Sequence, residues 1–437
     1  MLFRFIYNAA LTVFACCAAP KMWRDYKKHG KYRNSIKARL GKDFPQISKG
    51  PGPVIWFHAV SVGEVKAIAP LAQKIKEAFA GCRLLVTTIT ETGQAEAHKS
   101  IPYADAHGYL PIDWPSVIRP IVKKIAPDLV IVAEGDHWHH FLSAAKGSGA
   151  HLALVNGKIS KKTFSRLSKL PWAAKQIVGL YDLYCVQGEE YATRFRKLGI
   201  KEDRIHITGN LKFDSSYPVM GKEERCVWHE RLNNRPVIVA GSTHDPEEKL
   251  LLEQCRQLSK EFPDLLLILV PRHPDRFKEV EGLVKTSSLP YTTLSILEGD
   301  TAASLQDKAV LIVDKMGALR DIYQLADIAY VAGTFTDKVG GHNITEPSYY
   351  GIPVVYGPHI FSQPDLHLLA QEYNAAIQVH TPQELYNTLL DLLKNPDKRR
   401  TIGDNGKKLF QHAQGATDRT IALLETTGRL TGERKKT

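Results

Sequence analysis

Short apolar runs alternate with longer amphipathic stretches from residue 53 onward. A first series reads PVIWFHAV, RLLVTTIT, DLVIVAE, HLALVNG and LYCVQG, and a second reads PVIVAGST, LLLILVPR, AVLIVD, IAYVAG and IPVVYG. Continuous apolar runs of this length are typical of strands buried on both faces, and the stretches between them are long enough for helices. The pattern predicts an α/β fold with two Rossmann-like domains in tandem, facing each other across a cleft.

A polar, proline-containing segment separates the two series and is expected to be a linker. The chain has 437 residues, which exceeds the usual size of one domain. The predicted organisation is a membrane-anchor helix at 1–20, a basic juxtamembrane segment at 21–45, an N-terminal domain at 46–215, a linker at 216–235, a C-terminal domain at 236–425 and a basic tail at 426–437.

The N-terminus combines an apolar stretch with a basic one. Residues 2–19, LFRFIYNAALTVFACCAA, are barely long enough to span a bilayer, and Arg4 and Asn8 interrupt them. Nine basic residues follow, with Asp25 as the one acid among them: Lys21, Arg24, Lys27, Lys28, Lys31, Arg33, Lys37, Arg39 and Lys42. Such a block disfavours translocation and attracts anionic headgroups. We therefore expect the first helix to hold the protein at a membrane, either spanning it or lying in the interface, with the other domains on the cytoplasmic side.

The overall charge suits an anionic partner. The formal net charge is +12, which fits nucleic acid, acidic lipid or phosphorylated substrates. There is no RRM, KH or zinc-finger signature, and much of the charge lies in the juxtamembrane segment, so nucleic acid is not expected. The six cysteines are scattered without a CxxC pair, which favours a reducing compartment over a zinc site or a disulfide framework.

The stretch HAVSVGEVK, at the end of the first apolar run, has two readings. Ser61 and Glu64 fit a capping box, in which the Glu64 side chain folds back onto the Ser61 amide. Alternatively, Gly63 leaves room for another molecule, and the helix N-terminus keeps Glu64 ionised toward the cleft. An ionised carboxylate there could accept a proton from an incoming hydroxyl.

The second series carries two strand exits that suit an anion. AGSTHDPEE places Ser242 and Thr243 ahead of a helix, where free amides could hold a phosphate. VPRHPDRF places Arg272 and His273 directly after an apolar run, between two stiffening prolines. An arginine in such a loop is either a solvated surface charge or part of a binding site.

Two further loops suit a nucleoside. In DKMGALRDIY, the turn Met316-Gly317-Ala318 could pack against a base, although it also fits an ordinary helix start. In GGHNITEP, two glycines precede an N-x-x-E capping box from Asn343 to Glu346, so a glycine loop opens into a helix that can receive a phosphate. Glu346 could then accept hydrogen bonds from a ribose diol.

Taken in order, these motifs resemble a known family. HAVSVGE, TTITETG, GNLKFD, GSTHDPEE, VPRHPDRF, DKMGALRDIY and GGHNITEP are similar to the corresponding segments of the Kdo (3-deoxy-D-manno-octulosonic acid) transferases of lipid A biosynthesis, glycosyltransferase family 30. These enzymes are inverting glycosyltransferases of the GT-B type. The resemblance covers nearly the whole chain.

The resemblance implies a role for each motif. Glu64 would be the general base, and Glu134 and Lys212 would stabilise the transition state. The donor would be CMP-Kdo, and the acceptor a phosphorylated lipid A precursor (lipid IVA) at the inner face of the inner membrane, receiving one or more Kdo residues. No cofactor and no metal are expected. The nucleotide would contact Arg272, His273, Met316, Gly317, Ala318, Asn343, Ile344, Thr345 and Glu346. Ser242 and Thr243 are expected as a further phosphate loop from their position at a strand exit, and not from the resemblance.

The chain departs from the family pattern in the acceptor half. The usual E-x-E-x-W-P-N reads EGDHWHH, with Asp136 as the second acid, and the usual NARIS reads NGKIS, with Lys158 in place of arginine. His137, His139 and His140 are interpreted as polar groups of a loop rather than metal ligands. Donor use is therefore better supported than acceptor choice.

Two other functions remain open on the sequence. One is a GT-B transferase that uses a UDP-sugar, and the other is a non-enzymatic, membrane-associated binder of anionic lipid or nucleic acid. The oligomeric state is not indicated.

Overall fold

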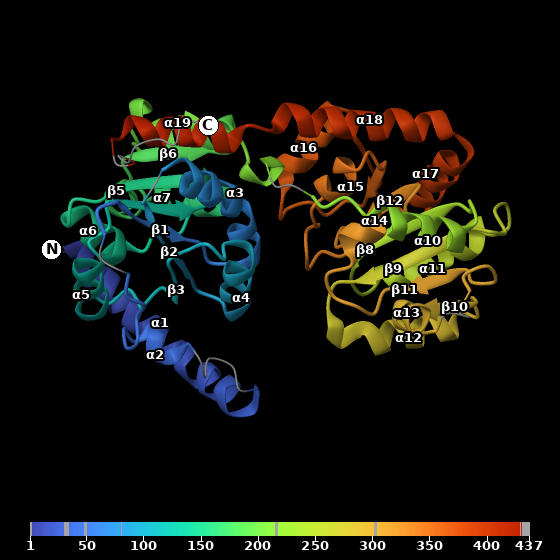
Figure 1. The fold of residues 1–437 in the computed structure, drawn as a ribbon, viewed down its shortest axis with the longest axis horizontal. Coiled ribbons are helices and arrows are strands. Elements are labelled where there is room, and N and C mark those ends of the chain that lie inside the picture. The colour runs from blue at the N-terminus through green and yellow to red at the C-terminus, as the bar shows by residue number, and fades with distance from the viewer. Residues whose placement is uncertain are drawn as a thin grey trace. The chain divides into compact units, whose positions relative to one another are not determined.

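The computed structural model describes residues 2–29, 35–47, 50–79, 81–214, 217–300, 304–428 and 430. The chain forms two compact units: an N-terminal unit of residues 1–215 and 413–437, and a C-terminal unit of residues 216–412. Each unit contains one seven-stranded sheet, and every strand pair is parallel (Figure 1). The predicted class, α/β with two Rossmann-like domains, is confirmed.

The sheet of the N-terminal unit has the strand order β3-β2-β1-β4-β5-β6-β7. The chain starts in the middle at β1 and moves first to one edge and then to the other, so β1 and β4 flank the point where the direction reverses. The strands are β1 Val54–His58, β2 Arg83–Thr88, β3 Ala106–Tyr109, β4 Leu129–Ala133, β5 His151–Gly157, β6 Leu183–Val186 and β7 Ile205–Ile207.

Helices cover both faces of this sheet because successive strand side chains point to opposite sides. Trp56 lies in the core on the side of α5 and α6, and Phe57 lies in the core on the side of α3 and α19. The helices are α1 Leu2–His29, α2 Ile36–Arg39, α3 Val62–Ala78, α4 Glu91–Ser100, α5 Pro115–Ile125, α6 His139–Gly147, α7 Lys161–Ser168, α8 Pro171–Ile177, α9 Glu189–Lys197 and α19 Ala416–Thr426, with 3-10 turns η1 Glu202–Arg204 and η2 Leu211–Asp214.

The C-terminal unit repeats this architecture with the strand order β10-β11-β9-β8-β12-β13-β14. Its strands are β8 Val237–Thr243, β9 Leu266–Pro271, β10 Tyr291–Thr293, β11 Val310–Ile312, β12 Ile328–Val331, β13 Val354–Tyr356 and β14 Ala376–Gln378. Its helices are α10 Lys222–Leu232, α11 Glu247–Leu258, η3 Pro274–Arg276, α12 Phe277–Thr286, α13 Leu294–Gly299, α14 Leu319–Tyr323, α15 Thr345–Tyr349, α16 Pro364–Glu372, α17 Pro382–Lys394 and α18 Pro396–Ala413.

Two predicted boundaries differ from the structure. The segment at 216–235 is not a plain linker, because α10 lies within it and packs Trp228 and Leu232 into the core of the C-terminal unit. The end of the predicted C-terminal domain returns to the N-terminal unit, because α19 packs Ala416, Ile421 and Leu424 into the core beside α3. The predicted basic tail is described only at residues 426–428 and 430.

The N-terminal helix is longer than the predicted anchor. α1 continues through Pro20 to His29 and so includes part of the predicted basic segment, whereas Lys31 and Arg33 lie outside the described residues. Within the described residues, one stretch is long and apolar enough to cross a membrane by length and composition, Leu2–Pro20, with a mean hydropathy of 1.6.

Candidate active site

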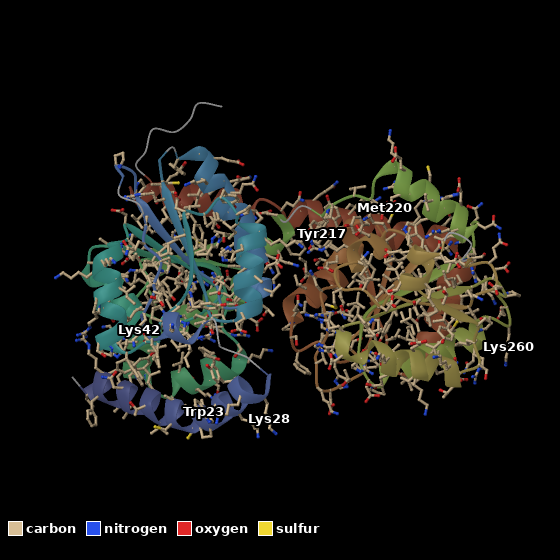
Figure 2. The ribbon with its side chains drawn as sticks, turned by 60° about the horizontal axis from the view of Figure 1, so that its bottom comes forward. Trp23, Lys28, Lys42, Tyr217, Met220 and Lys260 are labelled. Atoms are coloured by element: carbon tan, nitrogen blue, oxygen red, sulfur yellow. The ribbon has the colours of Figure 1, made fainter. Side chains whose placement is uncertain are left out.

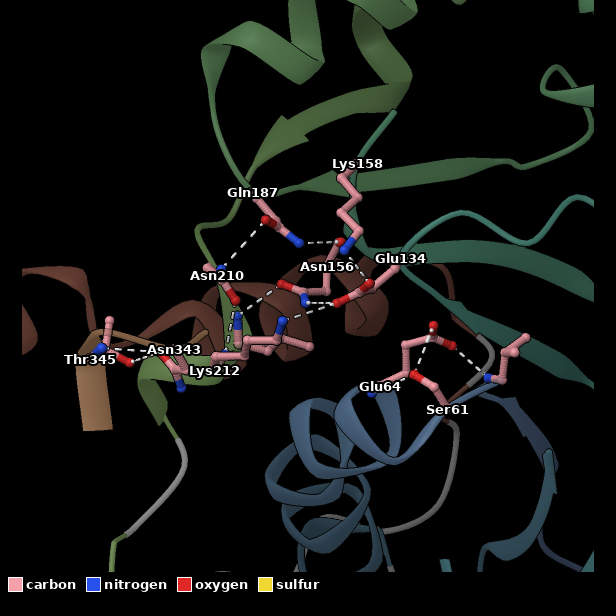
Figure 3. A network of polar contacts seen from close by, with 12 residues as sticks. Ser61, Glu64, Glu134, Asn156, Lys158, Gln187, Asn210, Lys212, Asn343 and Thr345 are labelled. Atoms are coloured by element: carbon pink, nitrogen blue, oxygen red, sulfur yellow. Dashed lines mark hydrogen bonds and ion pairs between the residues drawn. The ribbon is translucent and has the colours of Figure 1, made fainter. Parts of the chain in front are cut away.

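The carboxyl ends of the strands in the N-terminal unit carry most of its predicted catalytic residues. Parallel strands end at one edge of a sheet, so the segments after β1, β4 and β5 meet there. Glu64 follows β1, Glu134 follows β4, and Asn156 and Lys158 lie at the end of β5 (Figure 3).

Glu64 makes the contacts of a helix cap. The Ser61 Oγ accepts a hydrogen bond from the Glu64 amide at 3.4 Å and donates one to the Glu64 carboxylate at 3.2 Å. The other carboxylate oxygen accepts a bond from the amide of Val60 and not, as predicted, from the amide of Ser61. Glu64 lies on the first turn of α3, so the bend before the helix brings the Val60 amide within its reach.

The surroundings of Glu64 act on its charge in addition to the helix N-terminus named in the prediction. Burial raises the pKa of Glu64, the negative charge of Glu134 raises it further, and the Val60 and Ser61 hydrogen bonds and Lys158 only partly oppose these effects. A carboxylate with a raised pKa is a stronger base than an exposed glutamate, which is the property that proton abstraction needs.

Glu134 is buried at 8% exposure and is held by two lysines. Lys158 forms an ion pair with its Oε2, and the Lys212 Nζ lies 3.5 Å from its Oε1. The Asn156 amide donates to the same Oε1 at 3.4 Å. Both Glu134 and Asn156 have positive φ, at 59° and 52°, so the backbone turns sharply after β4 and β5 to bring these side chains together.

The two lysines decide the charge of Glu134. Burial alone would raise its pKa most strongly, but Lys212 and Lys158 together outweigh burial and hold the pKa below its usual range. Glu134 is therefore the ionised partner in a cluster with two cations, whereas Glu64 is the carboxylate whose proton is held more tightly. The structure thus brings Glu134 and Lys212 into contact. Glu64 is near enough for the negative charge of Glu134 to raise its pKa.

Asp136 is the third carboxylate at this edge. Burial, Glu64 and Glu134 together raise its pKa to about 7, against the opposing effect of Lys158. The Tyr181 hydroxyl donates to its backbone carbonyl at 2.8 Å and fixes this part of the turn. Asp136 replaces the second acid of the family pattern, so the departure noted in the sequence lies inside the site.

Sequence reasoning missed a set of amides that hold Lys212 in place. The Asn156 Oδ1 accepts from the Leu211 amide at 3.0 Å, and the Gln187 side chain donates to the Asn156 carbonyl at 2.9 Å (Figure 3). The Asn210 side chain accepts from the Lys212 amide at 3.0 Å. Asn156 and Gln187 lie where β5 and β6 end, and that position was the available signal.

The histidines near Asp136 lie at the start of helix α6 or in the turn before it. His139 and His140 begin α6 rather than forming a loop, and His137 lies in the turn before it. Burial lowers the pKa of His137 to about 4. Among the described residues, no group of three or more His, Cys, Asp or Glu side chains is arranged to hold a metal ion.

In the C-terminal unit, three of the predicted motifs meet through histidines. The rings of His244 and His342 stack with Nε2 atoms 2.8 Å apart, and the ring of His273 packs edge-on against His244 at 5.4 Å. These residues belong to GSTHDPEE, GGHNITEP and VPRHPDRF, so the exits of β8, β9 and β12 converge. Burial, together with nearby basic side chains, lowers the pKa values of His244 and His342 to about 4.

Arg272 and His273 are exposed at this convergence. The Arg272 amide donates to the carbonyl of Thr243 at 3.1 Å, so the arginine is fixed beside the end of β8. Ser242 has a φ of 60° and Thr243 is fully buried. The side chain of Arg272 forms no hydrogen bond or ion pair with the described residues, which leaves its guanidinium available to an anion.

The predicted phosphate loop at 240–248 contains an acid, Glu247, that binds amides of the protein itself. The carboxylate of Glu247, at the start of α11, accepts from the amides of Gly333, Thr334 and Phe335 at 2.7–3.0 Å. It also accepts from the amide of His244 at 3.3 Å. This buried acid ties the β12 exit to α11 and takes up the amide of His244, one of the amides of the predicted loop.

The two loops predicted to bind a nucleoside, at 316–318 and 343–346, each lie at the start of a short helix, but their contacts differ from those predicted. Met316 is 53% exposed, Gly317 has a φ of 91°, and Ala318 precedes α14. Asn343 does not form the predicted capping box: its Oδ1 accepts from the amide and hydroxyl of Thr345 at 3.0 and 2.7 Å.

Glu346 does not make the contact of the predicted capping box either. Its Oε1 lies 3.4 Å from the Arg320 guanidinium of α14, so it links the two loops instead of capping α15. Ile344 and Thr345, between Asn343 and Glu346, are buried.

Comparison with known proteins assigns the chain to a family. The 3-deoxy-D-manno-octulosonic acid transferase of Chlamydia trachomatis serovar A is 35% identical over 427 residues, which is 96% of each chain. The chain belongs to the 3-deoxy-D-manno-octulosonic acid transferase family. The model of that family, described as 3-Deoxy-D-manno-octulosonic-acid transferase (kdotransferase), matches residues 34–215. The transferase of Haemophilus influenzae is 30% identical over 403 residues, 91% of this chain and 92% of that one.

The predicted Kdo transferase class, a glycosyltransferase, is thereby confirmed. The fold is confirmed by a solved structure, a putative UDP-N-acetylglucosamine 2-epimerase from Listeria monocytogenes. It covers 89% of this chain and 100% of its own with a TM-score of 0.60, at 14% identity. The chain thus has the predicted GT-B type of fold.

Proposed function

We propose that this Kdo transferase moves Kdo from CMP-Kdo to a lipid A precursor, with Glu64 as the general base. The observation that supports this most directly is the cluster of the partly buried Glu64 and the buried Glu134 with Lys158 and Lys212 at one edge of the N-terminal sheet. In this cluster one carboxylate has a raised pKa and the other is held ionised by cations. Carboxylates whose environments push their pKa values apart are typical of divided roles in catalysis.

In the proposed reaction Glu64 accepts the proton of the acceptor hydroxyl as the hydroxyl oxygen attacks the anomeric carbon of Kdo. The bond from that carbon to the phosphate oxygen of CMP breaks on the opposite side, so the configuration inverts. Since CMP is a good leaving group, a moderately strong base in the right position suffices. Lys212, together with the ionised Glu134 that holds it, stabilises the charge that develops in the transition state.

We assign the donor to the C-terminal unit. The exposed guanidinium of Arg272 and the ring of His273 suit the donor phosphate, because charge-assisted bonds from arginine to phosphate are strong. Met316, Gly317 and Ala318 present an exposed turn to the base, and the segment from Asn343 to Glu346 carries groups for the ribose. Ser242 and Thr243 are placed beside Arg272.

We further propose that the enzyme works at the inner membrane with both units on the cytoplasmic side. The apolar stretch Leu2–Pro20 and the basic residues that follow it support this location.

The deciding experiment is incubation of the full chain with CMP-Kdo and lipid IVA, followed by mass analysis of the lipid. We expect a mass increase of one or more Kdo units and competition by CMP that exceeds competition by UDP. Transfer from a UDP-sugar instead, or no transfer to the lipid, would contradict the proposal.

A further inference from the structure

An apolar cavity of about 650 Å³ lies between α1 and the carboxyl edge of the N-terminal sheet. Its walls include Ala15 and Ala18 of α1, Leu40 after α2, and Ile89, Leu110 and Trp138 from the strand exits. The volume is within the range of small-molecule sites, roughly 300–1,000 Å³. The cavity extends along α1 from Leu11 to Tyr26, a length of about 22 Å at the usual helical rise. The space is thus long and lined mainly by carbon.

Polar contacts hold α1 against the N-terminal unit. The Tyr7 hydroxyl donates to the Asp113 carboxylate at 2.8 Å, and the Asn8 side chain is 2.6 Å from the His140 Nε2. Phe3 packs edge-on against His139 at 4.7 Å. Polar side chains in an apolar helix need partners when water is excluded, and here the unit itself supplies them. This stretch of α1 therefore lies along the unit.

The outer side of α1 is apolar and exposed. Phe5 and Val13 are 74% and 62% exposed. Trp23, which lines the cavity toward the other end of the helix, is itself 60% exposed (Figure 2). A helix that is docked on a domain by polar groups and presents apolar side chains outward is suited to lie in the plane of the membrane interface. The cavity then lies between the membrane surface and the sheet edge.

One wall of the cavity is shared with the candidate active site. The carbonyl of Ile89, which lines the cavity, accepts a bond from the Arg39 guanidinium. The next residue, Thr90, donates its hydroxyl to the Val60 carbonyl at 3.1 Å, and the Val60 amide binds the Glu64 carboxylate. Two hydrogen bonds, through Thr90 and Val60, therefore link this wall of the cavity to Glu64.

We propose that this cavity holds an acyl chain of the lipid acceptor, which makes α1 part of the acceptor site. The inference rests on the proposed function. It is supported by the apolar lining, by the hydrogen bonds that link one wall to Glu64, and by basic residues at the end of the cavity that suit a phosphorylated headgroup. Arg39 lines the cavity itself, and Lys27 and Lys28 directly follow Tyr26, the last residue of α1 among the lining residues (Figure 2).

A membrane phospholipid has acyl chains and phosphate as well, but it lacks the sugar hydroxyl that transfer requires. Of these two lipids, the acceptor alone carries the hydroxyl whose proton the proposed base Glu64, linked to the cavity wall through Thr90 and Val60, would accept. The acceptor is therefore the occupant that this geometry favours.

The test uses the full chain in detergent micelles and lipid IVA with a photoreactive diazirine at the end of one acyl chain. Ala18→Phe fills the cavity from α1, and Ala10→Phe places the same side chain at an exposed position of the same helix. We expect photolabelling of peptides that contain the cavity residues. Ala18→Phe should reduce it about tenfold or more, since losing the burial of two methylenes weakens binding by that factor, and Ala10→Phe should not.

Three results would overturn the proposal: equal labelling of the two variants, labelling confined to the outer side of α1, or displacement by phosphatidylglycerol as efficient as displacement by unlabelled lipid IVA. Ala15→Leu is a second, smaller filling of the same space and should act in the same direction.

Because labelling needs no transfer, it separates this inference from the proposed function. Labelled cavity peptides without any Kdo transfer would refute the function alone. An unchanged KM for lipid IVA in Ala18→Phe, with normal transfer, would refute the acyl-chain site alone.

Discussion

The first turns of α3 and α17 are built from the same parts but lie in different surroundings. In each, a hydroxyl residue caps the helix and accepts from the amide of a glutamate, Ser61 from Glu64 and Thr381 from Glu384 at 3.1 Å. In each, the carboxylate accepts from the amide of the residue before the cap, which for Glu384 is His380 at 2.7 Å.

The difference lies in what surrounds the two carboxylates. Glu384 is exposed, whereas Glu64 is partly buried near Glu134, Asp136 and Lys158. A capping box therefore does not decide whether its glutamate is catalytic. The neighbouring charges and the burial decide it, and the two helices provide a matched pair on which to test this.

The largest effect should separate these two glutamates. Glu64→Gln should lower kcat about 10²- to 10⁴-fold, because an amide cannot accept the hydroxyl proton. Glu384→Gln removes the same carboxylate from the same local geometry and should leave kcat within about twofold, as an exposed substitution usually does. Initial rates of Kdo transfer and CMP binding by calorimetry measure both. Similar activity in the two variants would show that Glu64 is only a cap.

The burial of the Asp136 carboxylate should also change how the free energy of unfolding depends on pH. Asp136 has a pKa raised to about 7, so the folded state holds its proton more tightly than the unfolded state. Its contribution to stability is therefore complete at low pH and is lost as the pH rises toward 7. Asp136→Asn should raise the free energy of unfolding by about 2 kcal/mol at pH 8 and change it little at pH 4.

Thermal unfolding at the two pH values measures this change. Asp203→Asn alters an exposed carboxylate of the same unit and serves as the control, with no gain expected at either pH. If Asp136→Asn stabilised the protein equally at pH 4 and pH 8, burial of its charge would not be the cause.

Replacing Lys158 tests whether neighbouring charges set the pKa of Glu64. Its charge lowers the pKa of Glu64 and pairs with Glu134. Lys158→Met should therefore raise the pKa of Glu64 further and move the acidic limb of the kcat/KM profile to higher pH. We expect a loss of about tenfold at pH 6 and a smaller loss at pH 8. Lys161→Met, at a nearby lysine with an 87% exposed side chain, should leave the profile in place. A uniform loss at all pH values would contradict this account of Lys158.

The strand exits could be predicted from the sequence because each contains its own signal, an apolar run followed by small, polar or charged residues. β1 with Glu64 and β9 with Arg272 are examples. The direction of the pKa shift of Glu64 could not be predicted, because it depends on burial and on Glu134, which is 70 residues away in the chain. For the same reason the box expected at Asn343 and Glu346 was wrong: Arg320, on another helix, holds Glu346.

Helix α19 shows the same limit of prediction from local sequence. The sequence of α19 is amphipathic and fits either unit, and only the packing of Ile421 and Leu424 beside α3 assigns it to the first. Local patterns predict elements and their termini, whereas the contacts between distant segments decide which side chains share a site.

The smallest effect concerns the two capping hydroxyls. Ser61→Ala and Thr381→Ala should each cost about 1 kcal/mol of stability, because each removes an acceptor from a helix N-terminus. Only Ser61→Ala should also change catalysis, since the Ser61 hydroxyl donates to the Glu64 carboxylate and lowers its pKa. The acidic limb of kcat/KM should shift to higher pH in Ser61→Ala and stay in place in Thr381→Ala. If both variants kept the wild-type profile, the hydrogen bond from Ser61 would stabilise the helix without tuning the base.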